Sequence, residues 1–303
     1  MWQGRNDGDS PLVLRVFQKV KLENDFRNIK NKDFVLQGFA VDEGVKRNMG
    51  RVGAAEAPNI IRKNMSNFPI TSPYFNLLDF GDVICEDGNL ENAQEKLSNS
   101  VSNIISKNGK SIVLGGGHEV MFAHYSGLKK ALPNKKIGII NIDAHFDNRM
   151  KSVEIGATSG TGFSQIAESG DLHSLHIGIQ KNSNTLQLFD YAHQNKMKYL
   201  IADELYYENL HHIYETIDAF TKEIDVLYLT ICMDVFNASI APGVSAAAYN
   251  GIFADVTFMN FFRHILGNEK MIAMDIAEVN PIYDIQERTA RLAASLVNEW
   301  LTI

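Results

Sequence analysis

The chain has 303 residues, of which 45% are hydrophobic and 21% are charged, and its formal net charge at pH 7 is −7. This composition is typical of a soluble globular protein, and the length allows a sizeable hydrophobic core. The acidic balance argues against a nucleic-acid partner, because phosphate binding needs a basic surface.

The chain shows no signal for membranes or disulfides. No apolar run approaches the ~18 residues of a membrane span, and the polar start "MWQGRNDGDS" lacks the apolar centre of a signal peptide. The two cysteines, Cys85 and Cys232, do not suggest a disulfide framework. We therefore expect a cytoplasmic protein without a membrane partner.

Short apolar runs alternate with amphipathic stretches along the chain. The predicted strands are residues 111–114, 137–142, 176–179, 198–202, 226–231 and 271–277, and the clearest predicted helices are residues 90–106, 120–132 and 287–301. Strands that alternate with helices of this length indicate βαβ units, and hence a parallel sheet covered on both faces.

Polar residues follow four of these predicted strands. They are Gly115–Gly117 with His118 and Glu119, then Asp143, His145 and Asp147, then Cys232 and Asp234, and finally Glu278. Open parallel α/β sheets bind their ligands outside the carboxyl ends of the strands. The pattern therefore predicts one shared site.

Asp143, His145 and Asp147 are the clearest chemical signal. If the backbone stays extended, their i, i+2, i+4 spacing points the three side chains to one side. Two carboxylates and an imidazole are costly to desolvate together unless a cation holds them, so we predict a metal site. Taken alone, His118 could be a loop histidine and Asp234 a capping residue at a strand end.

At these residues the sequence resembles the arginase–agmatinase ureohydrolases, over nearly the whole chain. The shared segments are "GGGHE" (115–119), "DAHFD" (143–147), the Asp234 region and "EVNP" (278–281). The formimidoylglutamase branch is the most similar, through "WQGR" (2–5), "NMGRVGAAEAP" (48–58), "DAHFDNR" (143–149) and "APGVSA" (241–246). The resemblance implies one domain over residues 1–303, with a three-layer α/β/α fold around a central, mostly parallel eight-stranded sheet.

The resemblance also implies two Mn²⁺ ions per subunit. One ion would be held by His118, Asp143 and Asp147, and the other by His145 and Asp234, with Asp143 bridging. The family has a second bridging aspartate in the motif S-x-D-x-D, where this chain has Cys232. A thiolate is a soft ligand and Mn²⁺ prefers oxygen and imidazole, so we expect weaker occupancy of one site. Thiolate bridging, a single ion, and a second ion bound without this ligand all remain open.

The formimidoylglutamase branch implies a metal-dependent hydrolase that cleaves a linear amidine C–N bond. The substrate would be N-formimidoyl-L-glutamate, an intermediate of histidine degradation, and the products L-glutamate and formamide. Metal ions lower the pKa of bound water to near neutrality. Asp147 is the expected proton carrier, and Glu278 is expected to bind the amidinium group.

Substrate selection is expected from residues outside the metal ligands. Arg149 is expected to bind a substrate carboxylate through two hydrogen bonds. Ser159 takes the place of a histidine that arginases and agmatinases carry near the substrate. Asn182 and Asn184 are further candidates for contacts with a carboxylate.

Two alternative functions remain open. The chain could hydrolyse another amidine or guanidine acid, as a guanidinobutyrase or an agmatinase does, or it could be a non-catalytic relative that binds a metabolite. In each case the partner is a small molecule. By resemblance we expect a homo-oligomer, either a trimer or a hexamer.

Overall fold

One parallel sheet forms the centre of the molecule in a computed structural model that describes residues 2–73 and 75–303. Its strands, in chain order, are β1 (Lys21–Leu22), β2 (Phe34–Ala40), β3 (Leu77–Ile84), β4 (Lys110–Leu114), β5 (Ile137–Ile142), β6 (Ser174–Ile179), β7 (Lys198–Ile201), β8 (Val226–Cys232) and β9 (Met271–Ala277). The order across the sheet is β1-β3-β2-β4-β9-β8-β5-β6-β7, and all the recorded strand pairs are parallel.

The helices connect these strands and cover the sheet. They are α1 (Val16–Lys19), α2 (Glu43–Arg47), α3 (Ala57–Met65), α4 (Leu90–Ser106), α5 (Val120–Ala131), α6 (Gly162–Glu168), α7 (Leu186–Gln194), α8 (Leu210–Lys222), α9 (Val256–Leu266) and α10 (Arg288–Thr302). Among the described residues, none of them combines the length and hydropathy that a membrane crossing requires.

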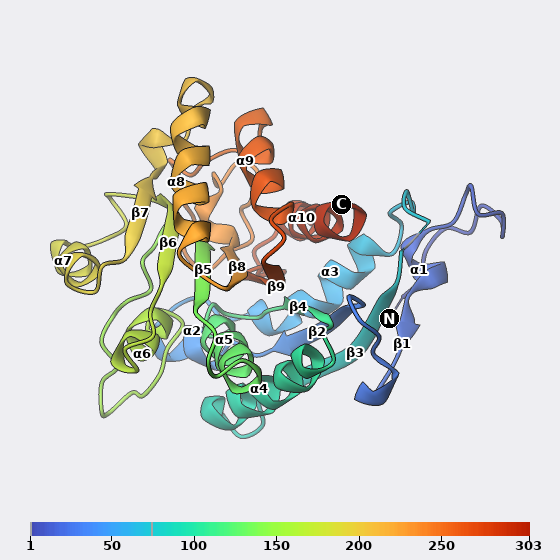
Figure 1. The fold of residues 1–303 in the computed structure, drawn as a ribbon, viewed down its shortest axis with the longest axis horizontal. Helices are drawn as coiled ribbons and strands as arrows, with labels where there is room; N and C mark the ends of the chain where they lie inside the picture. The colour runs from blue at the N-terminus through green and yellow to red at the C-terminus, as the bar shows by residue number, and fades with distance from the viewer. Residues whose placement is uncertain (1, 74) are drawn as a thin grey trace.

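The two larger of three hydrophobic core clusters lie on opposite faces of the sheet and show that the fold has three layers. Apolar side chains of α3, α8, α9 and α10 pack on one face of the sheet, and those of α4, α5, α6 and α7 pack on the other (Figure 1). Strand β5 contributes side chains to both clusters. Ile140 and Ile142 belong to the first, and Ile137 and Ile139 belong to the second. Successive residues of a strand point to opposite faces, so a strand covered on both sides is apolar throughout.

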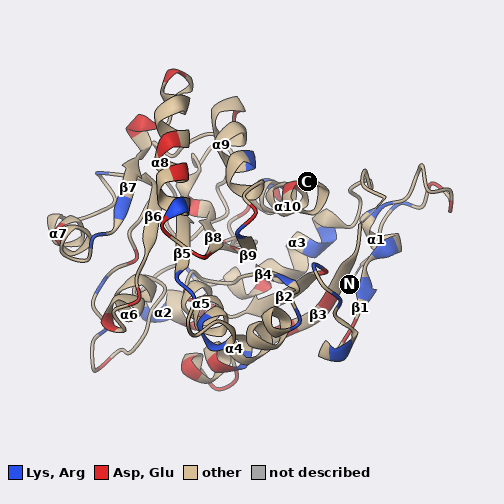
Figure 2. Ribbon diagram, viewed as in Figure 1, with Lys and Arg blue, Asp and Glu red and all other residues tan. Residues whose placement is uncertain are grey.

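The predicted fold class is confirmed, with one more strand than expected. The additional strand is β1, a two-residue edge strand that pairs with β3 through Lys21 and Leu22. One sheet contains strands from residues 21 to 277, and the single domain that we expect over residues 1–303 stays a prediction. Figure 2 shows acidic and basic residues interspersed over the helices of both layers.

Candidate metal centre and cleft

Four neighbouring strands bring the predicted site residues together. Strands β4, β9, β8 and β5 are adjacent in the middle of the sheet, and each is followed by one of the polar groups that the sequence analysis singled out. Because the strands are parallel, their carboxyl ends lie at the same edge. His118, Asp143, Cys232, Asp234 and Glu278 are all buried there.

The glycines after β4 are required by close packing of the backbone. A Cβ atom at Gly116 would lie 1.7 Å from the carbonyl oxygen of Val41, so only glycine fits. The amide of Gly117 donates to the same carbonyl at 2.9 Å. The turn then places the amide of His118 3.0 Å from Oε1 of Glu278, which joins two distant segments at the site.

The segment after β5 does not stay extended as the spacing argument assumed. The strand ends at Ile142, and Oδ1 of Asp143 accepts a hydrogen bond from the amide of His145 at 2.8 Å. Asp147 has a φ of 46° and Glu278 a φ of 66°, which is the left-handed region that side chains other than glycine rarely adopt. Such strain concentrates at functional sites. The three side chains therefore converge through a bend.

Asp143 lies between the two histidines of the site. Its Oδ2 is 3.1 Å from Nδ1 of His118, and its Oδ1 is 3.5 Å from Nδ1 of His145. His118 Nδ1 is also 2.7 Å from Oδ2 of Asp147, and His145 Nδ1 is 3.2 Å from Oδ2 of Asp234. Asp143 is thus placed to bridge two cations.

The donor atoms form two groups that share Asp143. One group is His118, Asp143 and Cys232, and the other is Asp143, His145 and Asp234; within each, the candidate ligand atoms lie within 4.8 Å of one another. Asp143 is the carboxylate common to both groups, which is the position that a bridging ligand would take. Asp147 is not a member of either group, although its carboxylate contacts His118.

The electrostatics of the site favour bound positive charge. Burial opposes protonation of both imidazoles, but the carboxylates Asp143 and Asp147 raise the pKa of His118, and Asp234 and Asp143 raise that of His145. Burial raises the pKa of Asp147 and that of Asp234. The carboxylates therefore stabilise a proton on the histidines, and the same negative charge would stabilise a bound metal ion.

The donor set fits a pair of divalent cations. Oδ1 of Asp234 and Oε2 of Glu278 are buried and have no hydrogen-bond partner among the described residues, which leaves acceptor capacity inside the site. Carboxylate and imidazole are the ligands that Mn²⁺ prefers. Cys232 is the exception, since burial first and the surrounding carboxylates second raise the pKa of its thiol, so that it becomes a thiolate only with difficulty.

A buried network of polar side chains positions the imidazole of His118 through its Nε2 atom. Nε2 of His118 lies 2.9 Å from Oγ1 of Thr230, and Thr230 donates to Oδ1 of Asp275 at 2.6 Å. Asp275 also contacts Nδ1 of His124 and accepts a hydrogen bond from Tyr228. Partners of this kind fix which nitrogen a histidine presents to a metal. The sequence analysis missed this network, although Thr230 and Asp275 interrupt otherwise apolar strands.

The cleft above the metal ligands has a volume of about 310 Å³. Arg149, Ser159 and Glu278, which are predicted to contact the substrate, line it together with His118, His145, Asp147, Cys232 and Asp234. It is also lined by residues to which the sequence analysis assigned no role, namely Asn48, Met49, Gly50, Arg51, Leu188, Ser245 and Ala246. Most of these residues lie in the segments "NMGR" and "APGVSA". These segments were already singled out by the resemblance, although no role was given to their residues.

The structure gives Asn184 and Asn182 different surroundings from those we expected. Oδ1 of Asn184 accepts from the amide of Phe146 at 3.0 Å, and its Nδ2 donates to the carbonyls of Ala144 and Gln180 at 2.9 and 2.8 Å. Its amide is therefore used to hold the loop after β5. Asn182 is exposed and lines a separate hollow of about 130 Å³.

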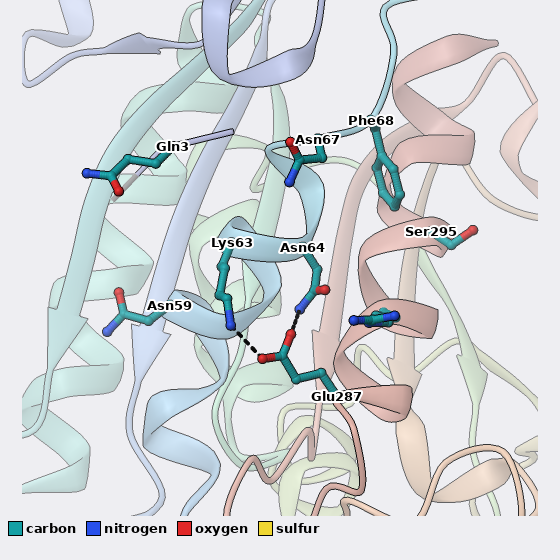
Figure 3. Close-up of a pocket in the computed structure, with 9 residues that line it drawn as sticks. Gln3, Asn59, Lys63, Asn64, Asn67, Phe68, Glu287 and Ser295 are labelled. Carbon is teal, nitrogen blue, oxygen red and sulfur yellow. Dashed lines mark hydrogen bonds and ion pairs between the residues drawn. The ribbon is translucent and has the colours of Figure 1, made fainter. Parts of the chain in front are cut away.

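A larger hollow of about 870 Å³ lies between the N-terminal segment, α3 and α10. Figure 3 shows that Lys63 and Asn64 of α3 point toward Glu287, with Lys63 Nζ 2.5 Å from Oε1 of Glu287. This hollow lies apart from the strand ends that carry the candidate metal ligands. We therefore do not assign the functional site to it, although its volume is larger. The smaller cleft contains the reactive groups.

Comparisons with known proteins agree with this geometry. The model of the arginase family matches residues 32–302. The chain belongs to the arginase family.

Its curated relatives include the formimidoylglutamase of Staphylococcus carnosus, which is 38% identical over 99% of this chain and 97% of the relative. The formimidoylglutamase of a Geobacillus species is 42% identical over 99% of this chain and 93% of the relative. The resemblance predicted from sequence motifs is therefore confirmed.

Solved structures confirm the fold. The formimidoylglutamase of Bacillus subtilis superposes with a TM-score of 0.87 at 21% identity and covers 98% of this chain and 94% of its own. The formiminoglutamase of Trypanosoma cruzi, solved with two Mn²⁺ ions, has a TM-score of 0.81 at 24% identity and covers 89% of this chain and 93% of its own.

Proposed function

We propose that this arginase-family chain hydrolyses N-formimidoyl-L-glutamate to L-glutamate and formamide, as a Mn²⁺-dependent enzyme. The observation that carries the proposal is the composition of one cleft. Acidic metal ligands and Glu278 occupy its buried end, and Arg149 lies in the same cleft. A cationic amidine that also carries carboxylates matches both ends. The names of the curated relatives support the same substrate.

Two Mn²⁺ ions would be held by His118, Asp143, Asp147, His145 and Asp234, and Cys232 belongs to the group formed with His118 and Asp143. When bound, the ions would supply Lewis acidity, which makes a water molecule acidic enough to attack at neutral pH. The water adds to the formimidoyl carbon, the bond from that carbon to the glutamate nitrogen breaks, and the nitrogen leaves with a proton.

Glu278 and Asp147 would handle charge and protons during the reaction. Oε1 of Glu278 is held by the amide of His118, and its Oε2 is left to accept an N–H of the substrate amidinium. Burial raises the pKa of Asp147, so its carboxylate can hold a proton and pass it to the leaving nitrogen. Ser159 cannot titrate near neutral pH, so it would only position the substrate.

Arg149 would select substrates by charge. Its backbone is fixed on both sides, because its amide donates to the carbonyl of Gly160 at 2.9 Å and its carbonyl accepts from Ser164 at 2.6 Å. Among the described residues, its guanidinium makes no recorded ion pair. A planar guanidinium binds a carboxylate through two hydrogen bonds and repels a substrate that ends in an amine.

The test is formamide release from N-formimidoyl-L-glutamate by purified protein reconstituted with Mn²⁺, with a chelator-treated sample as control. We expect turnover that the chelator abolishes. Agmatine and 4-guanidinobutyrate, supplied in parallel, should be poor substrates. Turnover of either in place of the formimidoyl compound would instead support hydrolysis of a guanidine. Metal binding without turnover of any of the three would support a metabolite-binding relative.

We also propose that the protein is cytoplasmic and that it forms a homo-oligomer. The trimer or hexamer that the resemblance implies stays a prediction, which sedimentation of the purified protein can check.

A further inference from the structure

Asn48 is an amide at the mouth of the cleft that the mechanism above does not use. It follows α2, lines the cleft and is exposed. Among the described residues, its side-chain amide has no recorded hydrogen-bond partner. The substrate carries two carboxylates, and the expected contacts from Asn182 and Asn184 do not reach this cleft. Asn48 is therefore free to take a ligand.

The segment that carries Asn48 is held firmly against the opposite loop. The amide of Arg51 donates to Oγ of Ser245 at 2.8 Å, its Nε donates to the carbonyl of Ser245 at 2.9 Å, and its guanidinium stacks 4.2 Å from the centre of the Tyr283 ring. A Cβ atom at Gly50 would lie 2.6 Å from Oγ of Ser245. Arg51 thus joins the segment after α2 to the loop around Ser245, and this holds Asn48 in a fixed position.

Asn48 and Arg149 face the same point of the backbone. A Cβ atom built at Gly160 would lie 3.4 Å from Cδ of Arg149 and 3.5 and 3.6 Å from Nδ2 and Oδ1 of Asn48. Ser159, which precedes this glycine, is 8% exposed and lines the same cleft. A guanidinium, an amide and a hydroxyl from three segments therefore surround one space above Gly160.

We propose that Asn48 and Arg149 together bind the γ-carboxylate of the substrate, and that Asn48 determines specificity at this position. The proposal rests on the proposed function and names the end of the substrate that this subsite receives. His118, Asp143 and Asp234 are buried, whereas Asn48 and Arg149 are exposed at the mouth. The carboxylate at the mouth is the one further from the reacting carbon, which is the γ-carboxylate.

The roles of the two side chains differ. Arg149 supplies positive charge and binds either or both carboxylate oxygens, whereas the Nδ2 group of Asn48 donates one hydrogen bond of fixed direction. An aspartate at position 48 would accept hydrogen bonds and repel a carboxylate, but it could accept an N–H from a neutral amide. Asn48→Asp should therefore shift preference from glutamate to glutamine at this end of the substrate.

The experiment compares N-formimidoyl-L-glutamate with N-formimidoyl-L-glutamine, which has the same shape and a neutral γ-amide. We expect Asn48→Ala to raise KM for the glutamate substrate about tenfold with little change in kcat, as loss of a charge-assisted hydrogen bond does. Asn48→Asp should lower kcat/KM for the glutamate substrate by about 50-fold or more and for the glutamine substrate by much less.

Two further variants control for folding and for a general charge effect. Gly160→Ala places a methyl group at ordinary contact distance from both side chains, so it should fold, fill the subsite and raise KM. Asn103→Asp makes the same substitution at an exposed position on α4 and should change neither constant.

The outcomes separate this inference from the proposed function. If the wild-type protein does not turn over the glutamate substrate, the proposed function fails. If it does, but Asn48→Asp lowers kcat/KM equally for both substrates or for neither, then Asn48 does not read the γ-carboxylate and the inference is wrong. Unchanged KM in Gly160→Ala would overturn the shared subsite.

Discussion

Cys232 is the residue at which this chain departs most from the pattern expected from the resemblance, and it lies in one of the two groups of candidate metal ligands. It is 1% exposed and belongs to the group formed with His118 and Asp143. Burial and four neighbouring carboxylates raise the pKa of its thiol, so ligation requires loss of a strongly held proton. For a hard cation, this position is weaker than a carboxylate.

We predict that Cys232→Asp tightens binding of the more weakly held Mn²⁺ ion by about tenfold or more, because a carboxylate offers two hard oxygen atoms. Competition with a chelator of known affinity, combined with elemental analysis, would measure this change. Cys85→Ser is the matched control, since Cys85 lies outside both groups and should leave the affinity unchanged. Equal affinity in the wild type and Cys232→Asp would mean that the thiol serves as well as a carboxylate.

At the scale of elements, a buried ion cluster joins α3 to β3. Arg62 of α3 is completely buried, and its guanidinium lies 2.8 Å from Asp79 and 2.5 Å from Asp82. Trp2, from the segment "WQGR", donates its indole N–H to the other oxygen of Asp79 at 2.7 Å. One carboxylate thus connects the N-terminal segment, a strand and a helix, which gives this motif a structural role.

We predict that Arg62→Leu lowers the free energy of unfolding by about 3–5 kcal/mol, because it leaves Asp79 buried without its partner charge. Lys63→Leu, at the next position of the helix, removes an exposed ion pair with Glu287 and should cost no more than about 1 kcal/mol. Urea denaturation of both variants measures the difference. Similar losses in the two variants would show that burial of the first ion pair does not matter.

Strands and helices of the central and C-terminal parts could be predicted where apolar residues dominate the run or one face of the helix. The predicted ranges 137–142, 271–277 and 90–106 match β5, β9 and α4 in full. Strands β2 and β3, "FVLQGFA" and "LLDFGDVI", were not predicted, and two aspartates break the apolar run of β3. Asp79 shows why, because its carboxylate is buried only through partners that lie far away in the chain.

The candidate site was predictable where residue type alone indicates chemistry, as for His118, Asp143 and Asp234. Thr230 was not predictable, because its role depends on which side chain lies opposite. The segment that contains Asn48 was marked by the resemblance, but the role of this residue within it was not. Asn184 was expected to contact a substrate carboxylate, because a side-chain amide can hydrogen-bond either to a ligand or to the backbone. In the structure its three hydrogen-bond partners are all backbone groups, so its side chain holds the loop instead.

At the scale of the whole molecule, the metal site is a local source of repulsion inside a stable sheet. Asp143, Asp234 and Glu278 are buried close together, and burial raises the pKa of the last two. Folding therefore gathers carboxylates whose mutual repulsion a bound cation would relieve. Metal binding to the folded state should raise global stability.

We predict that saturating Mn²⁺ raises Tm by several degrees above that of the chelator-treated protein. Free metal at 100 times Kd contributes about 2.7 kcal/mol per site. Differential scanning fluorimetry measures the shift, and Asp143→Asn, which removes the shared ligand, should abolish most of it. An equal shift in that variant would place the stabilising ion elsewhere.

The hydrogen bond from the amide of His118 to Glu278 spans 160 residues of sequence. A ribosome-bound chain that has emerged only as far as β8 possesses most of the metal ligands, but it lacks the strand that separates β4 from β8 in the sheet. The metal site can close only after β9 inserts between them, because β9 is the neighbour of both. We therefore expect metal capture to follow the synthesis of β9, so that only nearly complete chains gain the stability that bound metal supplies.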